Sequence, residues 1–139
     1  MIGVVERESG EIRLEVCRDA TRQTCESVIF KHVAEGTMMY TDGWCGYEEL
    51  YLHDYRHKVV IHSKGEYARD DDGDGFHEVH CNTMEGIWSL LRQWIRTFRG
   101  VRKDRLHLYV NAFQFFYNFN KWAENNLECL LKWILPIHP

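Results

Sequence analysis

The sequence predicts an α/β fold in which helices pack against a β-sheet. One observation is the order of patterns along the chain, which runs strand, strand, helix, strand, strand and then long helices. A second is size, because 139 residues that are 45% hydrophobic and 14% aromatic suffice for one sizeable core but not for two ordinary domains. The chain has no internal repeat and no linker that would divide it. We therefore treat residues 1–139 as a single domain.

The first half of the chain predicts a hairpin, a helix and two further strands. Ile2–Glu6 and Ile12–Val16 carry β-branched residues on either side of a glycine-containing turn, which is typical of an antiparallel hairpin. The apolar spacing in Thr21–Val33 indicates a helix. Met38–Tyr40 and Lys58–His62 are short runs that predict strands.

The second half predicts helices after a polar loop. Ser63–Gly75 is rich in glycine and aspartate and is interpreted as a loop. Thr83–Phe98 and Lys103–Tyr117 have strong helical periodicity. A last amphipathic segment, Trp122–Leu135, ends before a proline.

Charge is distributed unevenly along the chain. The net charge of −4 does not suggest a nucleic-acid binder. Between residues 86 and 121, however, the sequence has seven basic residues and one acidic residue. A locally basic surface can bind phosphates. No apolar run approaches the roughly twenty residues of a membrane span. We expect no membrane association and an intracellular location, cytoplasmic or nuclear. The five scattered cysteines favour reduced thiols over a disulfide framework or a zinc ribbon.

The predicted helix 83–98 carries a column of charged residues. At about 100° per residue, Glu85, Arg92, Arg96 and Arg99 share one face, opposite an apolar stripe. The arginines could follow a phosphate backbone. The alternative is a solvated face, with Asn82 as N-cap and Glu85 three residues later as a capping-box pair. Spacing alone favours this alternative.

Asp42 lies just after a predicted strand, where a carboxylate is held rigidly at the edge of a sheet. Together with Glu85 it could hold a divalent metal, because two-metal phosphoryl transfer uses carboxylates to hold hard cations about 3.5 to 4 Å apart. The alternative for Asp42 is a simple Asp-Gly turn, which is the commonest meaning of that dipeptide. Neither carboxylate is persuasive alone.

Two further metal motifs fail on inspection. Asp70, Asp72, Asp74 and Gly75 match the opening of an EF-hand loop, but Cys81 stands where that loop requires a glutamate. The histidines of the HEVHC stretch lack the spacing that places two zinc ligands on one helical face.

Taken together, these segments resemble the DDE transposases of a bacterial insertion-sequence group related to the eukaryotic Merlin elements. VVERESGEIRLEV resembles the second and third strands of that family, and MYTDGWCGY resembles the stretch with its second aspartate. HKVVIHSKGEYAR and HCNTMEGIWSLLRQWIRTFRGV resemble its most recognisable block, and HLYVNAFQFFYN resembles its closing helix. The resemblance covers nearly the whole chain and implies an RNase H-like fold, a mixed sheet with flanking helices.

The resemblance also implies roles for individual residues. Asp42 would be the second acidic metal ligand and Glu85 the third, with Mg²⁺ or Mn²⁺ as the cofactor and Asn82 beside the site. Arg92 takes the position of a basic residue that contacts DNA. The remaining matched positions, which would lie near the site without an assigned role, are His57, His62 and Lys64.

The first aspartate of the family lies on a strand just upstream of the one that begins here at Ile2. We therefore expect this chain to lack that strand. Two functions follow. One is a transposase domain that cleaves and joins duplex DNA at transposon ends, with DNA and a homo-oligomer as partners. The other, which we prefer for present activity, is a non-catalytic remnant or domesticated module that keeps DNA-binding or interaction surfaces.

Overall fold

The computed structural model describes residues 1–42, 55–60, 68–71, 73–75 and 79–127. Its elements follow one another as β1 (Ile2–Val5), β2 (Ile12–Glu15), α1 (Arg22–His32), β3 (Met38–Asp42), β4 (Arg56–Val60), β5 (Ala68–Arg69), β6 (Val79–His80), α2 (Asn82–Arg96), the 3₁₀ helix η4 (Lys103–Arg105) and α3 (Leu106–Asn125). This is a mixed α/β architecture, as predicted.

The N-terminal hairpin and the first helix form where the sequence predicted them. Strands β1 and β2 pair antiparallel, with Gly3 opposite Leu14. Helix α1 begins after Thr21, whose side chain accepts a hydrogen bond from the Thr24 backbone, and it ends at His32, after which Val33 is extended. A capping threonine satisfies a backbone N–H that the first helical turn leaves without a partner. These predictions are confirmed.

The middle of the chain forms two further pairs of strands. Strands β3 and β4 are parallel, with Asp42 beside Val60. β4 begins two residues earlier than predicted, and residues 61 and 62 lie outside the described part. β5 falls inside the segment predicted to be a loop and pairs antiparallel with β6. The loop prediction is wrong there, because a two-residue strand has too little periodicity to be seen in sequence.

Both long helices differ from prediction at their C-terminal ends. α2 stops at Arg96 and not at Phe98, since Thr97, Phe98 and Arg99 donate backbone hydrogen bonds three residues back in a tightened turn. α3 continues to Asn125, so Trp122 belongs to α3 and does not open a separate segment. Residues 128–135 of that predicted segment lie outside the described part.

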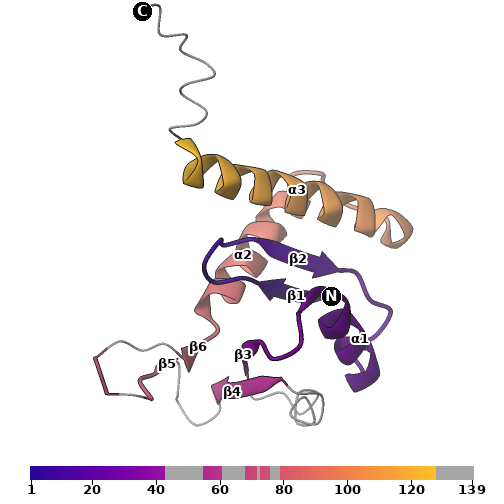
Figure 1. Cartoon of the computed structure of the whole chain (residues 1–139). Helices are drawn as coiled ribbons and strands as arrows, with labels where there is room; N and C mark the ends of the chain where they lie inside the picture. The colour runs from indigo at the N-terminus through magenta and orange to yellow at the C-terminus, as the bar shows by residue number, and fades with distance from the viewer. Residues whose placement is uncertain (43–54, 61–67, 72, 76–78, 128–139) are drawn as a thin grey trace, which may run out of the picture.

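The main core lies between β2, α2 and α3. Each element contributes an apolar stripe, and two further small clusters lie beneath α1 and at β4. The buried residues of the main core are Ile12, Leu14, Ile87, Leu91, Val110 and Phe113. In Figure 1, α3 lies across the hairpin and α2 passes behind it. This packing fixes the direction of α2 relative to the hairpin.

Amide side chains of α3 close the outer edge of β2. Asn118 accepts a hydrogen bond from the Ile12 backbone nitrogen at 2.8 Å and donates one to the Ile12 carbonyl at 3.0 Å. Gln114 accepts from the Leu14 backbone nitrogen at 2.6 Å. An open strand edge invites pairing with other chains, so these contacts both satisfy and protect β2.

The three strand pairs remain separate ladders within the described residues. The predicted mixed sheet is therefore present as small two-stranded sheets beside helices, and the RNase H-like topology stays a prediction. Among the described helices, none combines the length and hydropathy that crossing a bilayer requires.

Candidate functional site

Asp42 is the last residue of β3 and is exposed. Side chains alternate along a strand, so Asp42 shares a face with Tyr40, while the buried Thr41 points to the opposite face. The parallel ladder with β4 pairs Asp42 with Val60 and Thr41 with Val59, which holds the backbone up to this position. Gly43 lies outside the described residues, so the alternative of an Asp-Gly turn is not decided.

Glu85 lies in the first turn of α2 and is also exposed. The structure changes the interpretation of its surroundings, because the N-cap of α2 is Cys81 and no side chain caps the helix. Asn82 is thus the first helical residue, and the predicted capping-box pair of Asn82 and Glu85 is wrong. A carboxylate in this turn interacts favourably with the positive end of the helix dipole.

Strand β6 brings the two carboxylates into one region. β6 packs beside β3 and β4 and leads directly into α2, so the end of β3 and the start of α2 lie close. Both charges act on the Cys81 thiol: its pKa is raised to about 11 mainly by burial and next by the charge of Asp42, while Arg7 lowers it and Glu85 raises it. Asp42 and Glu85, which are 43 residues apart in sequence, therefore act electrostatically on the same sulfur.

Arg7 connects the elements that carry these carboxylates. Its guanidinium lies 3.7 Å from the centre of the Tyr40 ring, two residues before Asp42. It also donates a hydrogen bond of 2.9 Å to the carbonyl of His80, just before α2 begins. Burial, and then the charge of Arg7, lower the pKa of His80.

Sequence reasoning missed Arg7 entirely. It stands between Glu6 and Glu8 in a turn, a pattern typical of a solvated loop. Its partners Tyr40 and His80 are 33 and 73 residues away in the chain. No local signal could have identified it.

His57 supports the end of β3 on the face opposite Asp42. Its Nε2 lies 2.6 Å from the Thr41 hydroxyl, which donates to the Asp42 carbonyl at 3.0 Å. Burial lowers the pKa of His57, so the ring is neutral at pH 7 and its Nε2–H donates to Thr41. The other two residues predicted near the site, His62 and Lys64, lie outside the described part of the chain.

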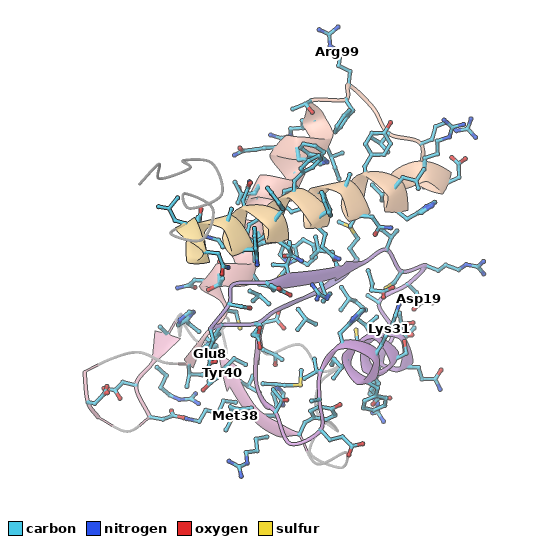
Figure 2. The ribbon with its side chains drawn as sticks, turned by 45° about the horizontal axis from the view of Figure 1, so that its top comes forward. Glu8, Asp19, Lys31, Met38, Tyr40 and Arg99 are labelled. Carbon is cyan, nitrogen blue, oxygen red and sulfur yellow. The ribbon has the colours of Figure 1, made fainter. Side chains whose placement is uncertain are left out.

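The predicted arginine column is shorter than expected. Arg92 and Arg96 are one turn apart on α2 and exposed. Arg92 also borders a shallow hollow of about 320 Å³ with Met1 and Trp88. Arg99 lies beyond the helix with φ 52°, in the left-handed region, and Figure 2 shows it projecting away from the body of the molecule. The placement of Arg99 on this helical face is wrong, because the helix ends three residues earlier.

The donor set suits a hard cation, since carboxylate oxygens are the ligands that Mg²⁺ and Mn²⁺ prefer. Asp42 and Glu85 would supply two of them. Within the described ranges, no group of three or more histidine, cysteine, aspartate or glutamate side chains is placed to hold a metal ion. The described part of the chain thus offers a pair of carboxylates, with a cationic Arg7 close to both elements that carry them.

Comparison with known proteins gives two findings. Residues 1–118 match the family described as the ISXO2-like transposase domain. The chain is 35% identical over 112 residues to an uncharacterized protein in transposable element ISH50 from Halobacterium salinarum, an alignment that covers 80% of this chain and 36% of that protein. The chain thus spans about a third of the length of this relative. No solved structure matches the chain.

Proposed function

The chain belongs to the ISXO2-like transposase domain family, and from this premise we propose that it carries part of the catalytic machinery of an insertion-sequence transposase. The proposed reaction is the cleavage and joining of duplex DNA at transposon ends by metal-dependent phosphoryl transfer. Its substrate places this activity inside the cell. Asp42 and Glu85 are the proposed metal ligands.

The proposal rests on one observation, that the charges of Asp42 and Glu85 both act on the Cys81 thiol. Residues far apart in sequence converge in a fold either because packing happens to place them together or because a ligand needs them both. Asp42 and Glu85 both raise the pKa of the Cys81 thiol, so both charges lie within electrostatic reach of one point. Two carboxylates near one point are a donor pair of the kind that hard divalent cations bind, which favours the second explanation.

Each side chain has a defined part in the proposed site. Asp42 and Glu85 hold the cation from a strand end and a helix start, both of which are rigid elements. When bound, Mg²⁺ or Mn²⁺ would stabilise negative charge on the reacting phosphate. Neutral His57 fixes the backbone of Asp42 through Thr41.

Mn²⁺ binding tests the site directly. The chain is titrated with Mn²⁺, and the free ion is measured by electron paramagnetic resonance. We expect one binding site, whose affinity Asp42→Asn and Glu85→Gln each lower at least tenfold. The reason is that each variant removes one of few anionic ligands and no other side chain replaces it. Asp19→Asn is the matched control, since Asp19 is an exposed carboxylate that accepts hydrogen bonds from Thr21 and Thr24 near α1. Equal affinity in all four proteins would refute the assignment of both ligands. Strand transfer is then assayed with the 139-residue chain, Mn²⁺ and duplex transposon ends.

A second function, DNA binding without catalysis, is favoured by a different observation. Arg92 and Arg96 are exposed one turn apart on α2 and can contact successive phosphates whether or not a metal is bound. Fluorescence anisotropy with duplex DNA should then give an affinity that falls steeply with salt and is reduced for all sequences by the Arg92→Ala, Arg96→Ala double variant. Arg22→Ala on α1 serves as the control. DNA binding that survives in Asp42→Asn, together with no metal-dependent strand transfer, would select this function over the first.

A further inference from the structure

Arg7 extends from a part of the backbone that is itself well held. It lies in the turn between β1 and β2, where the Glu6 nitrogen donates a hydrogen bond to the Glu11 carbonyl at 2.9 Å. The next strand is fixed to α3, because Asn118 bonds both backbone polar atoms of Ile12. The Arg7 side chain is exposed, yet its starting point is therefore tied to the main core.

The first contact of Arg7 is with β3, on the face that carries Asp42. The guanidinium carbon lies 3.7 Å from the centre of the Tyr40 ring. Tyr40 and Asp42 are two residues apart on the strand, so their side chains leave the same face of β3 about 7 Å apart. A planar guanidinium is attracted to the face of an aromatic ring. This contact holds the end of β3 on the side where the Asp42 carboxylate emerges.

The second contact of Arg7 is with the backbone that begins α2. The guanidinium Nη2 donates a hydrogen bond of 2.9 Å to the His80 carbonyl. The next residue, Cys81, is the N-cap of α2, and its carbonyl accepts a hydrogen bond from the Glu85 nitrogen at 3.4 Å. Arg7 thus holds the residue that directly precedes the cap, and the cap is bonded to the residue that carries the second carboxylate.

We propose that Arg7 is a positioning residue, whose single guanidinium joins the end of β3 to the start of α2 and so sets the spacing of Asp42 and Glu85. The inference rests on the proposed function, because it gives the two carboxylates their role as ligands of one divalent cation. Mg²⁺ and Mn²⁺ accept carboxylate oxygens only within about 2.0 to 2.6 Å. A small displacement of either element therefore weakens binding of the ion.

The charge of Arg7 and its two contacts have opposite effects on the affinity for a cation. A positive charge near the carboxylates repels a divalent ion, so removing the charge alone would raise the affinity. Loss of the contacts lets β3 and α2 move apart, which lowers the affinity. Each contact contributes a factor of about two to ten to such an equilibrium. We expect the loss of both contacts to outweigh the relief of repulsion, because the exposed charge is screened by solvent.

Mn²⁺ affinity, measured by electron paramagnetic resonance of the free ion, tests this sign. Arg7→Ala should lower the affinity roughly fivefold to twentyfold. Arg7→Lys keeps the charge but replaces the planar group with a point charge on a flexible stem, so it should also lower the affinity. Arg22→Ala is the matched control, because Arg22 is an arginine on α1 that pairs with Glu26. An affinity equal to or above that of wild type in Arg7→Ala, or an unchanged affinity in Arg7→Lys, would overturn the proposal.

Hydrogen exchange of the metal-free chain, followed by NMR, separates this proposal from the proposed function. Arg7→Ala should speed amide exchange at least severalfold both in residues 40–42 and in residues 82–85, which Arg7 joins. Exchange at the buried Val110 of α3 should stay unchanged, whereas a general loss of stability would speed it as well. Unchanged exchange in either segment would overturn the positioning role. Faster exchange in both segments, with no Mn²⁺ site in the wild-type chain, would support the positioning role and refute the metal site.

Discussion

Replacing Asp42 with asparagine should lower the pKa of the Cys81 thiol, which makes Cys81 a reporter of the candidate site. Burial is the largest cause of the raised pKa of about 11, followed by the charge of Asp42, and both Arg7 and Glu85 act on the same thiol. Asp42→Asn removes a negative charge that raises the pKa of Cys81 and leaves the burial of the thiol unchanged. The pKa of the variant should thus fall below about 11 but stay above the usual 9.0.

The size of the effect follows from the thiolate fraction. At pH 9, a thiol with a pKa of about 11 is about 1% ionised, and only the thiolate reacts with alkylating reagents. A pKa lowered to about 10 would raise the alkylation rate about tenfold, and the remaining burial limits the gain to less than roughly a hundredfold. The rate is measured at Cys81 by peptide mapping after timed iodoacetamide treatment between pH 7.5 and 10.5.

Three variants should change the alkylation rate of Cys81 in different directions, which a nonspecific disturbance of the fold would not do. Asp42→Asn and Glu85→Gln should both accelerate alkylation of Cys81, whereas Arg7→Ala should slow it, because Arg7 lowers the pKa. Alkylation of Cys25, which is 2% exposed in a different cluster, is the internal control. Equal rates at Cys81 in wild type and Asp42→Asn, or changes of the same sign in all three variants, would refute the convergence of these charges.

Three stability predictions can be checked by urea unfolding. Asn118→Ala should cost about 2 to 4 kcal/mol, because it strips two hydrogen bonds from the fully buried Ile12 backbone; a loss below about 0.5 kcal/mol would contradict the edge-closing role. Gly3→Ala should cost about 1 to 3 kcal/mol by overpacking, since a Cβ there would lie 2.5 to 2.9 Å from three side chains. The hydrogen bond from Lys31 is the largest cause that lowers the pKa of Glu15 in the folded state, so its contribution is present above the usual pKa of 4.5 and lost as pH falls through the lowered value. Glu15→Gln should flatten the loss of stability below about pH 4.5, and an unchanged acid limb would contradict this.

The elements that could be predicted from sequence are those whose signal is local. The hairpin, α1 and β3 were predicted because β-branched runs and apolar spacing act over a few residues. The family was also predictable, since its motifs keep their residue types in sequence order. The ends of α2 and α3 were not, because the last turns of a helix are decided by tertiary contacts as much as by propensity.

What the sequence by itself determined is the hairpin, α1, β3 and the main part of α2 and α3, the candidate carboxylates Asp42 and Glu85, and the family. Only the tertiary structure decided that both carboxylates act on Cys81 and that Arg7 connects β3 to β6, the strand that leads into α2. It also decided that Arg99 leaves the helical face. The physical reason is the separation in sequence over which the deciding interactions act. Helix and strand patterns arise between neighbours a few residues apart, whereas a site is assembled by packing between segments that are tens of residues apart, and this packing depends on the whole core at once.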